Sequence, residues 1–235
     1  MNIGLVSYES VNNDLGFNLS QIEKALRAVS DRADLLCFGE AFLQGFDSLT
    51  WNFDMDKKTA ISQDSNTMEA LKKMTLEYGT DLLLGYLELD GDAIYSSCAL
   101  IEKGEITYNY RRTSQGWKEI SLADGHYREG TSAEEFTYQD QTFKIALCGD
   151  LWDHPERFRT EGTLIWPVYV NYTTEDWKKE EEEYAKQAGM VCDLVLMVNP
   201  ISHDPESHGG AFIFSEGKLF NDVIYDTENI LIIGI

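Results

Sequence analysis

The chain has 235 residues, enough for one sizeable hydrophobic core, and its 41 acidic residues far outnumber its 19 Lys and Arg residues. The net charge of −22 argues against nucleic acid and against an anionic membrane surface as partners, because both bind a surplus of Lys and Arg. No apolar run reaches the roughly 18–20 residues of a membrane span, and the N-terminus lacks the basic and apolar regions of a signal peptide. We therefore expect a globular cytoplasmic protein.

Short apolar runs alternate with amphipathic segments from the start of the chain. In the first part we expect a strand over 3–6, and then a helix with apolar residues from Leu19 to Val29 and a capping box formed by Ser20 and Glu23. A continuous apolar run over 33–38 predicts a strand that is covered on both faces.

The same alternation continues through the rest of the chain. The expected elements are a helix over 66–78 ended by Gly79, a strand over 81–86, a hairpin of 96–101 and 106–110 around Lys103–Gly104, strands over 143–147 and 164–170, a charged helix over 175–188 ended by Gly189, a strand over 194–198, two short strands around Glu216–Gly217 and a strand over 230–233. No linker, repeat or low-complexity tract interrupts them, so we predict a single α/β domain over residues 1–235.

The four cysteines are widely separated and form no CxxC pair, which argues against both a disulfide framework and a zinc site. Cys37, Cys98 and Cys192 lie in or beside apolar strand runs, which is typical of buried core thiols. Cys148 is different because it ends an apolar strand and is followed by Gly149. Asp153 and Pro155 are residue types that open a helix, and a thiol before a helix N-terminus is stabilised as thiolate. Gly149 lets backbone amides approach a substrate oxygen, so the pattern indicates a nucleophile.

A cysteine nucleophile needs a group that takes its proton and returns it to a leaving amine. The four histidines (His126, His154, His203 and His208) lie in loop-like segments without a distinguishing setting, although His154 is close enough to Cys148 in sequence to line an entrance. Glu40 ends the apolar run 33–38, where burial would raise the pKa of its carboxyl group toward neutrality. Carboxylates at strand ends are common, so a purely structural role for Glu40 stays open at this point.

Two segments together resemble the carbon–nitrogen hydrolase (nitrilase) superfamily. Residues 18–46, NLSQIEKALRAVSDRADLLCFGEAFLQGF, are similar to the helix and strand that end in the family's catalytic glutamate, and residues 143–159, FKIALCGDLWDHPERFR, to the strand and elbow that carry its catalytic cysteine. The Cys-x-Asp-x-Trp form resembles the glutaminase domain of glutamine-dependent NAD synthetases and related amidases. The resemblance implies a four-layer α–β–β–α sandwich with Glu40 as general base and Cys148 as nucleophile.

The third element of this resemblance departs from the family. The family keeps a catalytic lysine after a Tyr-Arg pair, and here that position holds Arg112. An arginine still donates hydrogen bonds to an oxyanion, but its planar group is bulkier, and losing an oxyanion donor costs about 10²–10³ in rate. Lys118 lies six positions further on and is a poor substitute. A second, supporting carboxylate is expected shortly before Gly130, at Asp124 or at Glu129.

The resemblance implies hydrolysis of a C–N bond in a small-molecule amide through a thioester on Cys148. Gly149, Asp150, Trp152 and Asn171 are expected to neighbour the substrate, and the chemistry needs neither a metal nor an organic cofactor. The family assembles through its cysteine-bearing face, which predicts a homodimer or a higher homo-oligomer. Arg112 keeps open the alternative of a catalytically impaired or silent homologue that binds a small ligand or a partner protein. An unrelated flavodoxin-like binding domain is disfavoured by the Glu40 and Cys148 motifs.

Overall fold

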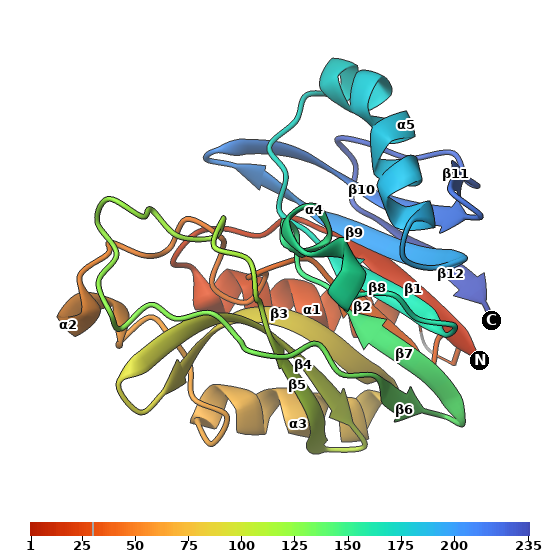
Figure 1. The fold of residues 1–235 in the computed structure, drawn as a ribbon. Helices are drawn as coiled ribbons and strands as arrows, with labels where there is room; N and C mark the ends of the chain where they lie inside the picture. Colours follow the sequence, from red (N-terminus) through yellow and green to blue (C-terminus); the bar gives the residue numbers. More distant parts are fainter. Residues whose placement is uncertain (30) are drawn as a thin grey trace.

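Two six-stranded sheets face each other in the computed structural model, which describes residues 1–29 and 31–235 (Figure 1). In spatial order, the first sheet contains β12 (Asn229–Gly234), β1 (Asn2–Ser7), β2 (Leu35–Phe38), β3 (Asp81–Asp90), β4 (Ala93–Glu102) and β5 (Glu105–Arg111). The second contains β11 (Lys218–Leu219), β10 (Glu206–Ser215), β9 (Leu194–His203), β8 (Thr163–Pro167), β7 (Gln141–Ile145) and β6 (Phe136–Tyr138). Each sheet has parallel central strands, β1–β2–β3 and β7–β8–β9, flanked by antiparallel ones.

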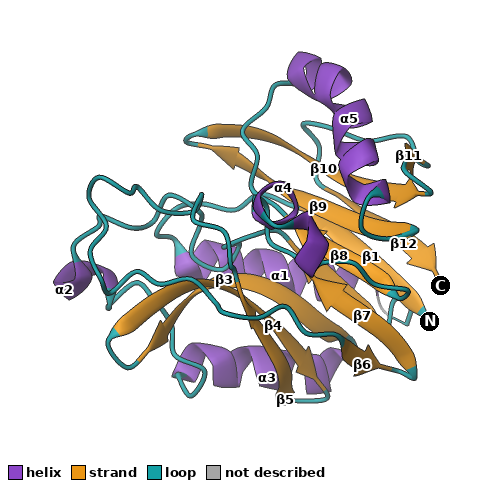
Figure 2. Cartoon of the chain, viewed as in Figure 1, coloured by secondary structure: helices purple, strands orange, loops and turns teal. Residues whose placement is uncertain are grey.

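Helices cover the outer faces of both sheets (Figure 2). α1 (Leu15–Val29) and α3 (Asn66–Tyr78) pack on the first sheet, and α5 (Thr174–Gly189) packs on β9, β10 and β11 of the second. Short helical turns form α2 (Phe53–Asp56), α4 (Asp150–Asp153) and a 3-10 turn at Pro155–Arg157. The predicted four-layer α–β–β–α sandwich is confirmed. Within the described residues no helix is long and apolar enough to cross a membrane.

The main core lies between the two sheets, and β2 shows why its sequence is apolar throughout. Leu35 and Cys37 belong to the cluster between the sheets, whereas Leu36 and Phe38 pack against the helices on the outer face. Successive side chains of a strand point to opposite faces, so a strand that is covered on both faces needs a continuous apolar run. The prediction of a doubly covered strand is therefore confirmed, although the strand itself begins at Leu35 rather than at residue 33.

Some predicted boundaries are confirmed and others are wrong. α3 has the predicted bounds, because Ser65 caps its N-terminus and Gly79 ends it with a left-handed φ of 64°. The capping box at Ser20 is wrong: α1 begins earlier, at Leu15, and the Ser20 hydroxyl donates to the carbonyl of Phe17 inside the helix. Gly189 is the last residue of α5 rather than its stop, and its hydrogen-only side chain allows the backbone of Gly217 to approach.

Candidate active site

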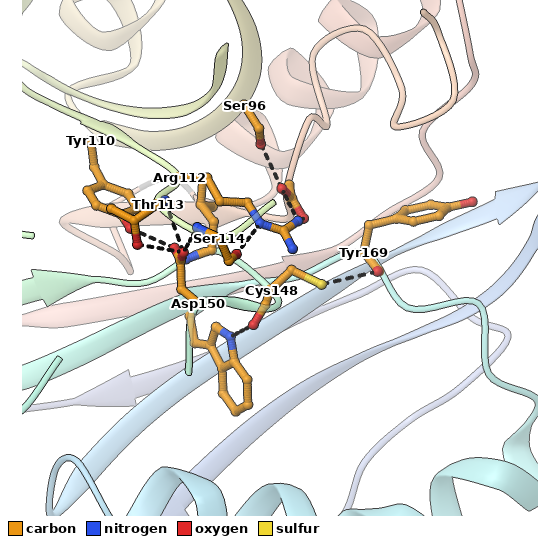
Figure 3. A network of polar contacts seen from close by, with 11 residues as sticks. Ser96, Tyr110, Arg112, Thr113, Ser114, Cys148, Asp150 and Tyr169 are labelled. Atoms are coloured by element: carbon orange, nitrogen blue, oxygen red, sulfur yellow. Dashed lines mark hydrogen bonds and ion pairs between the residues drawn. The ribbon is translucent and has the colours of Figure 1, made fainter. Parts of the chain in front are cut away.

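Cys148 lies on a sharp elbow between β7 and α4. Its amide donates to the carbonyl of Pro167 at 3.0 Å, and its own carbonyl accepts from the indole nitrogen of Trp166 at 2.9 Å. The backbone of Cys148 has a φ of 40°, in the left-handed region that residues other than glycine rarely adopt. The thiol is partly buried and reaches the carbonyl of Tyr169, with an Sγ to O distance of 3.6 Å (Figure 3). The elbow therefore holds the sulfur in a fixed direction at the end of the second sheet.

Glu40 lies just beyond the end of β2, in the first sheet, and is fully buried. Its amide donates to the carbonyl of Val168 at 3.2 Å, a bond that joins the two sheets near the site. Its carboxylate accepts from the hydroxyl of Ser96 at 2.6 Å. Gly85 on β3 must be a glycine here, because a Cβ atom would lie 2.2 Å from the carbonyl oxygen of Gly39. This close backbone packing fixes the position from which Glu40 projects.

Arg112 follows β5 directly and is only 2% exposed. Its Nη1 donates to both carboxylate oxygens of Glu40, at 2.9 and 3.1 Å, and its Nε donates to the hydroxyl of Ser114 at 2.7 Å. Its Nη2 makes no hydrogen bond to another described residue. A Cβ atom added at Gly149 would lie 2.6 Å from Nη2, and one added at Gly116 would lie 3.0 Å from it. The guanidinium group therefore fills space that glycine leaves next to the nucleophile.

The charges in this site act on one another. Burial raises the pKa of the Cys148 thiol to about 11; the charge of Arg112 opposes this increase and that of Glu40 adds to it. The resting thiol is therefore protonated near neutral pH, contrary to the sequence-based expectation that the helix N-terminus would favour the thiolate. Burial tends to lower the pKa of Arg112, but the surrounding acidic groups, Glu40 first among them, together outweigh burial and keep the guanidinium protonated.

Asp150 lies in the interior, between the two sheets. Its carboxylate accepts five hydrogen bonds: Oδ1 from the amide and hydroxyl of Thr113 and from the amide of Ser114, and Oδ2 from the hydroxyl of Tyr110 and the amide of Leu147. Four of the five hydrogen bonds come from the segment around Arg112 (Figure 3), and the fifth comes from the amide of Leu147, the residue before Cys148. The side chain predicted to neighbour the substrate is thus fully occupied by the protein itself.

The geometry of the site and the fold agree with a comparison to known families. Residues 2–196, most of the chain, match the family model described as carbon–nitrogen hydrolase. The chain belongs to the carbon–nitrogen hydrolase family.

Solved structures and a curated relative agree with this membership. An amidase from Nesterenkonia sp. AN1 superposes with a TM-score of 0.80 at 16% identity, covering 100% of this chain and 92% of the amidase. A CN-hydrolase superfamily protein from Xanthomonas campestris superposes with a TM-score of 0.80 at 14% identity, covering 99% of this chain and 89% of the other. These likenesses show the fold.

An arylacetone-specific nitrilase from Alcaligenes faecalis is 24% identical over 161 residues. The match covers 63% of this chain and 44% of the nitrilase, so the chain spans less than half of the length of this curated relative. Family membership, with an amidase and a nitrilase among the similar proteins, is consistent with hydrolysis of C–N bonds through a cysteine.

In this family member the other predicted site residues lie in different surroundings. Gly149 contacts the Arg112 guanidinium, as described above. Trp152 is 38% exposed, and its ring packs beside those of Trp166 and Tyr184, with centroid distances of 6.4 and 5.1 Å. Asn171 is exposed on the segment after β8. Of the four residues predicted to neighbour the substrate, Gly149 lies directly beside the Arg112 guanidinium, and Asp150 is bonded to Thr113 and Ser114, which follow Arg112.

The two carboxylates predicted to support the lysine position do not contact Arg112. Asp124 is exposed, and its Oδ1 lies 2.8 Å from Nδ1 of His126. Glu129 forms an ion pair with Lys118, while the next residue, Gly130, donates its amide to the Arg112 carbonyl at 2.8 Å. The carboxylate that pairs with Arg112 is instead Glu40, so the arginine and the predicted base are a directly bonded pair.

Sequence reasoning missed Ser96 and Ser114, which complete the site. Ser96 is a small hydroxyl residue in the otherwise mostly apolar strand β4, and such a residue at a buried position was a usable signal. Ser114 follows Arg112 by two residues and carries no recognisable pattern. The carbonyl of Tyr169, which accepts from the thiol, is backbone and cannot be read from the sequence.

Proposed function

We propose that this protein hydrolyses the C–N bond of a small amide through a thioester on Cys148. The observation that carries the proposal is the convergence of Glu40, Arg112 and Cys148, which come from the ends of strands in two different sheets. Glu40 and Arg112 are buried and directly bonded, and both act electrostatically on the thiol. A nucleophile, a carboxylate base and a fixed cation at one point are the groups that acyl transfer to a thiol requires.

Glu40 is the proposed general base. With its pKa raised to about 11, Cys148 is mostly a neutral thiol at pH 7, so proton removal has to accompany the attack of sulfur on the carbonyl carbon. Glu40 takes that proton and returns it to the leaving amine when the C–N bond breaks. A water molecule, deprotonated by the same carboxylate, then cleaves the thioester and releases the acid.

Two donors beside Cys148 are available for the oxyanion. The backbone amide of Gly149 and Nη2 of Arg112 make no hydrogen bond to another described residue, and they adjoin the nucleophile. We assign to them the stabilisation of the tetrahedral oxyanion. In this assignment Arg112 replaces the family's lysine, with Nη1 on the base and Nη2 directed to the substrate oxygen.

Covalent labelling of Cys148 tests the proposed nucleophile, and a panel of amides tests the proposed reaction. Fluoroacetamide is a suitable probe, because its acetamide moiety is covalently added at the active-site cysteine in a mutant of the Nesterenkonia sp. AN1 amidase. Sulfur displaces fluoride in this reaction, so we expect a mass increase of one acetamide group (–CH2CONH2) on the wild type and on the matched variant Cys192→Ala, and no increase on Cys148→Ala. An adduct of equal yield on Cys148→Ala contradicts the proposed nucleophile, and hydrolysis of no amide in a broad panel contradicts the proposed reaction.

A second candidate function is binding of a small ligand or a partner protein without turnover. It is favoured by one observation: Arg112 and Ser96 already occupy the carboxylate of Glu40. The variant Arg112→Lys separates the two candidates, because a lysine frees part of this carboxylate. A gain in amide turnover in this variant supports an impaired hydrolase, whereas no turnover in either protein supports the binding function.

A further inference from the structure

The carboxylate of Asp150 forms a joint between the nucleophile elbow and the segment that carries Arg112. It is fully buried, and its two oxygens are bonded to groups from both sheets. Oδ2 accepts from the amide of Leu147, the residue before Cys148, at 2.8 Å. Oδ1 accepts from the amide of Ser114 at 2.8 Å. One side chain therefore fixes the distance between the nucleophile and the residues that follow Arg112.

Ser114 continues this connection to the guanidinium. It is fully buried, and its hydroxyl accepts from Nε of Arg112 at 2.7 Å. Nη1 is held at the same time by Glu40. Because a guanidinium group is planar, fixing Nε and Nη1 also fixes the direction of Nη2, the nitrogen next to Gly149.

We propose that Asp150 and Ser114 are positioning residues that hold Nη2 of Arg112 against Cys148. The chain of contacts runs from the elbow through Asp150 to the backbone of Ser114, and from the Ser114 hydroxyl to Arg112. The inference deepens the proposed function, on which it rests, since it explains how an arginine is aligned where the family has a lysine.

The contacts that hold Arg112 should affect the reactivity of Cys148, because the charged groups around the thiol determine its thiolate fraction. Arg112 favours the thiolate of Cys148, whereas Glu40 and Asp150 oppose it. Tyr184 of α5 also faces the thiol, and burial raises the pKa of its hydroxyl so that it stays neutral. Displacement of Arg112 therefore lowers the thiolate fraction at a given pH, and the rate of alkylation by iodoacetamide falls with it.

The test is the alkylation rate of Cys148 in Ser114→Ala, a change that alters no charge and keeps the amide that bonds Asp150. An opposite charge at close range shifts a pKa by about one to three units, so loosening Arg112 should slow alkylation near pH 8 by about tenfold. The rate is followed by peptide mass mapping, which separates Cys148 from the three other cysteines. In an Arg112→Met background, Ser114→Ala should change nothing further, because its effect acts through the guanidinium.

Asp150→Asn tests the other half of the connection. Loss of its charge alone favours the thiolate, whereas release of Arg112 disfavours it, so the two effects must be separated. In the Arg112→Met background only the charge effect is left, and alkylation should become faster. In the protein that keeps Arg112, the ratio of the alkylation rate of Asp150→Asn to that of the wild type should be at least about threefold smaller than the corresponding ratio in the Arg112→Met background, and it can fall below one. Asp56→Asn is the matched control, because Asp56 is also a buried carboxylate bonded to backbone amides and to a tyrosine hydroxyl.

The outcomes are distinct. Equal alkylation rates for wild type and Ser114→Ala, or an equal slowing by Ser114→Ala with and without the guanidinium, overturn the inference. If the effect of Asp56→Asn depends on the presence of Arg112 as strongly as that of Asp150→Asn does, the inference is overturned as well, because the dependence would reflect general loosening of the fold. The alkylation rates are measured without amide turnover. Failure to hydrolyse any amide would therefore refute the proposed function, while the alkylation rates would still test the positioning of Arg112.

Discussion

Arg112 fits beside Cys148 only because position 149 carries no side chain. In Gly149→Ala the new Cβ would lie 2.6 Å from Nη2, closer than real contacts allow, and the guanidinium would have to move. We expect amide turnover to fall by about 10²–10³, the usual cost of losing an oxyanion donor. The control is Gly125→Ala, where a Cβ meets no atom within 4 Å. Equal kcat/KM values for the two variants would contradict this role of Arg112.

Glu40→Gln should change thiol reactivity and hydrolysis in opposite directions. The charge of Glu40 adds to the effect of burial in raising the pKa of Cys148, so its removal lowers that pKa and increases the thiolate fraction at pH 8. We expect alkylation by iodoacetamide to become about tenfold faster, while loss of the base slows amide hydrolysis by about 10²–10⁴.

The control for Glu40→Gln is Glu88→Gln, which removes another buried carboxylate that is bonded to an arginine, Arg111. This variant should leave the alkylation rate of Cys148 unchanged. Glu40→Gln leaves the buried Arg112 without its charged partner and is expected to lose about 3–5 kcal/mol of unfolding free energy, whereas Glu88→Gln should lose less, because Arg111 is partly exposed and keeps its ion pair with Asp90. A slower alkylation in Glu40→Gln would contradict the sign of the electrostatic effect.

The sequence singled out the three central side chains but not the way they are supported. Glu40 and Cys148 end apolar strands, and such positions can be read from the pattern; their catalytic roles stay predictions. Asp150 was placed with the substrate because it follows Cys148 closely, yet closeness in sequence does not reveal where a side chain points. Most of its hydrogen bonds come from a segment almost forty residues away, and only the folded structure shows those contacts.

At the scale of elements, α5 depends on a cap that the sequence analysis did not single out. The Thr173 hydroxyl accepts from the amide of Asp176 at 3.1 Å, and the Asp176 carboxylate accepts from the amide of Thr173 at 3.2 Å. Thr173→Ala should lower the unfolding free energy by about 1 kcal/mol, measured by urea denaturation. Thr173→Ser should keep the wild-type value, and so should Thr174→Ala. A loss in Thr174→Ala as large as in Thr173→Ala would contradict the assignment of the cap.

Elements with clear end signals were predicted best. The bounds of α3 and the turn at Lys103–Gly104 are confirmed, because cap and turn residues mark them. The strands over 143–147 and 164–170 were predicted too long: β7 ends at Ile145 and β8 at Pro167. The apolar residues beyond these ends leave the ladder and pack around the elbow, and an apolar run alone does not show where pairing stops. β6, with three residues, was too short to give a pattern.

At the scale of the whole molecule, the net charge of −22 opposes the compact state. Raising the ionic strength from about 0.01 to about 1 M shortens the Debye length from about 30 to about 3 Å and screens this repulsion. We expect the thermal midpoint to rise with NaCl, measured by circular dichroism. A midpoint that falls with salt would mean that favourable ion pairs outweigh the repulsion.

The architecture of the molecule was predictable because two motifs resembled a known family, and the four-layer sandwich is confirmed. Length and composition alone indicated only a globular chain with a sizeable core, and the alternation of apolar runs with amphipathic segments added the α/β class. The single domain over residues 1–235, the homo-oligomer and the cytoplasmic location stay predictions. A sedimentation experiment tests the oligomer, since a homodimer has twice the 26.7 kDa of one chain.

The position of the site between two sheets makes Cys148 an internal reporter of refolding. In the unfolded chain its thiol has an ordinary pKa of about 8.5, and it acquires the raised value when docking of the two sheets buries it, an increase to which Glu40 adds and which Arg112 opposes. Pulses of alkylating reagent at different times of refolding would then show when Cys148 loses its reactivity. That time marks the docking of the two sheets and is separate from the formation of either sheet. Peptide mass mapping would distinguish Cys148 from Cys37 and Cys98, which also face the interior, in a molecule that has both sheets but has not closed its core.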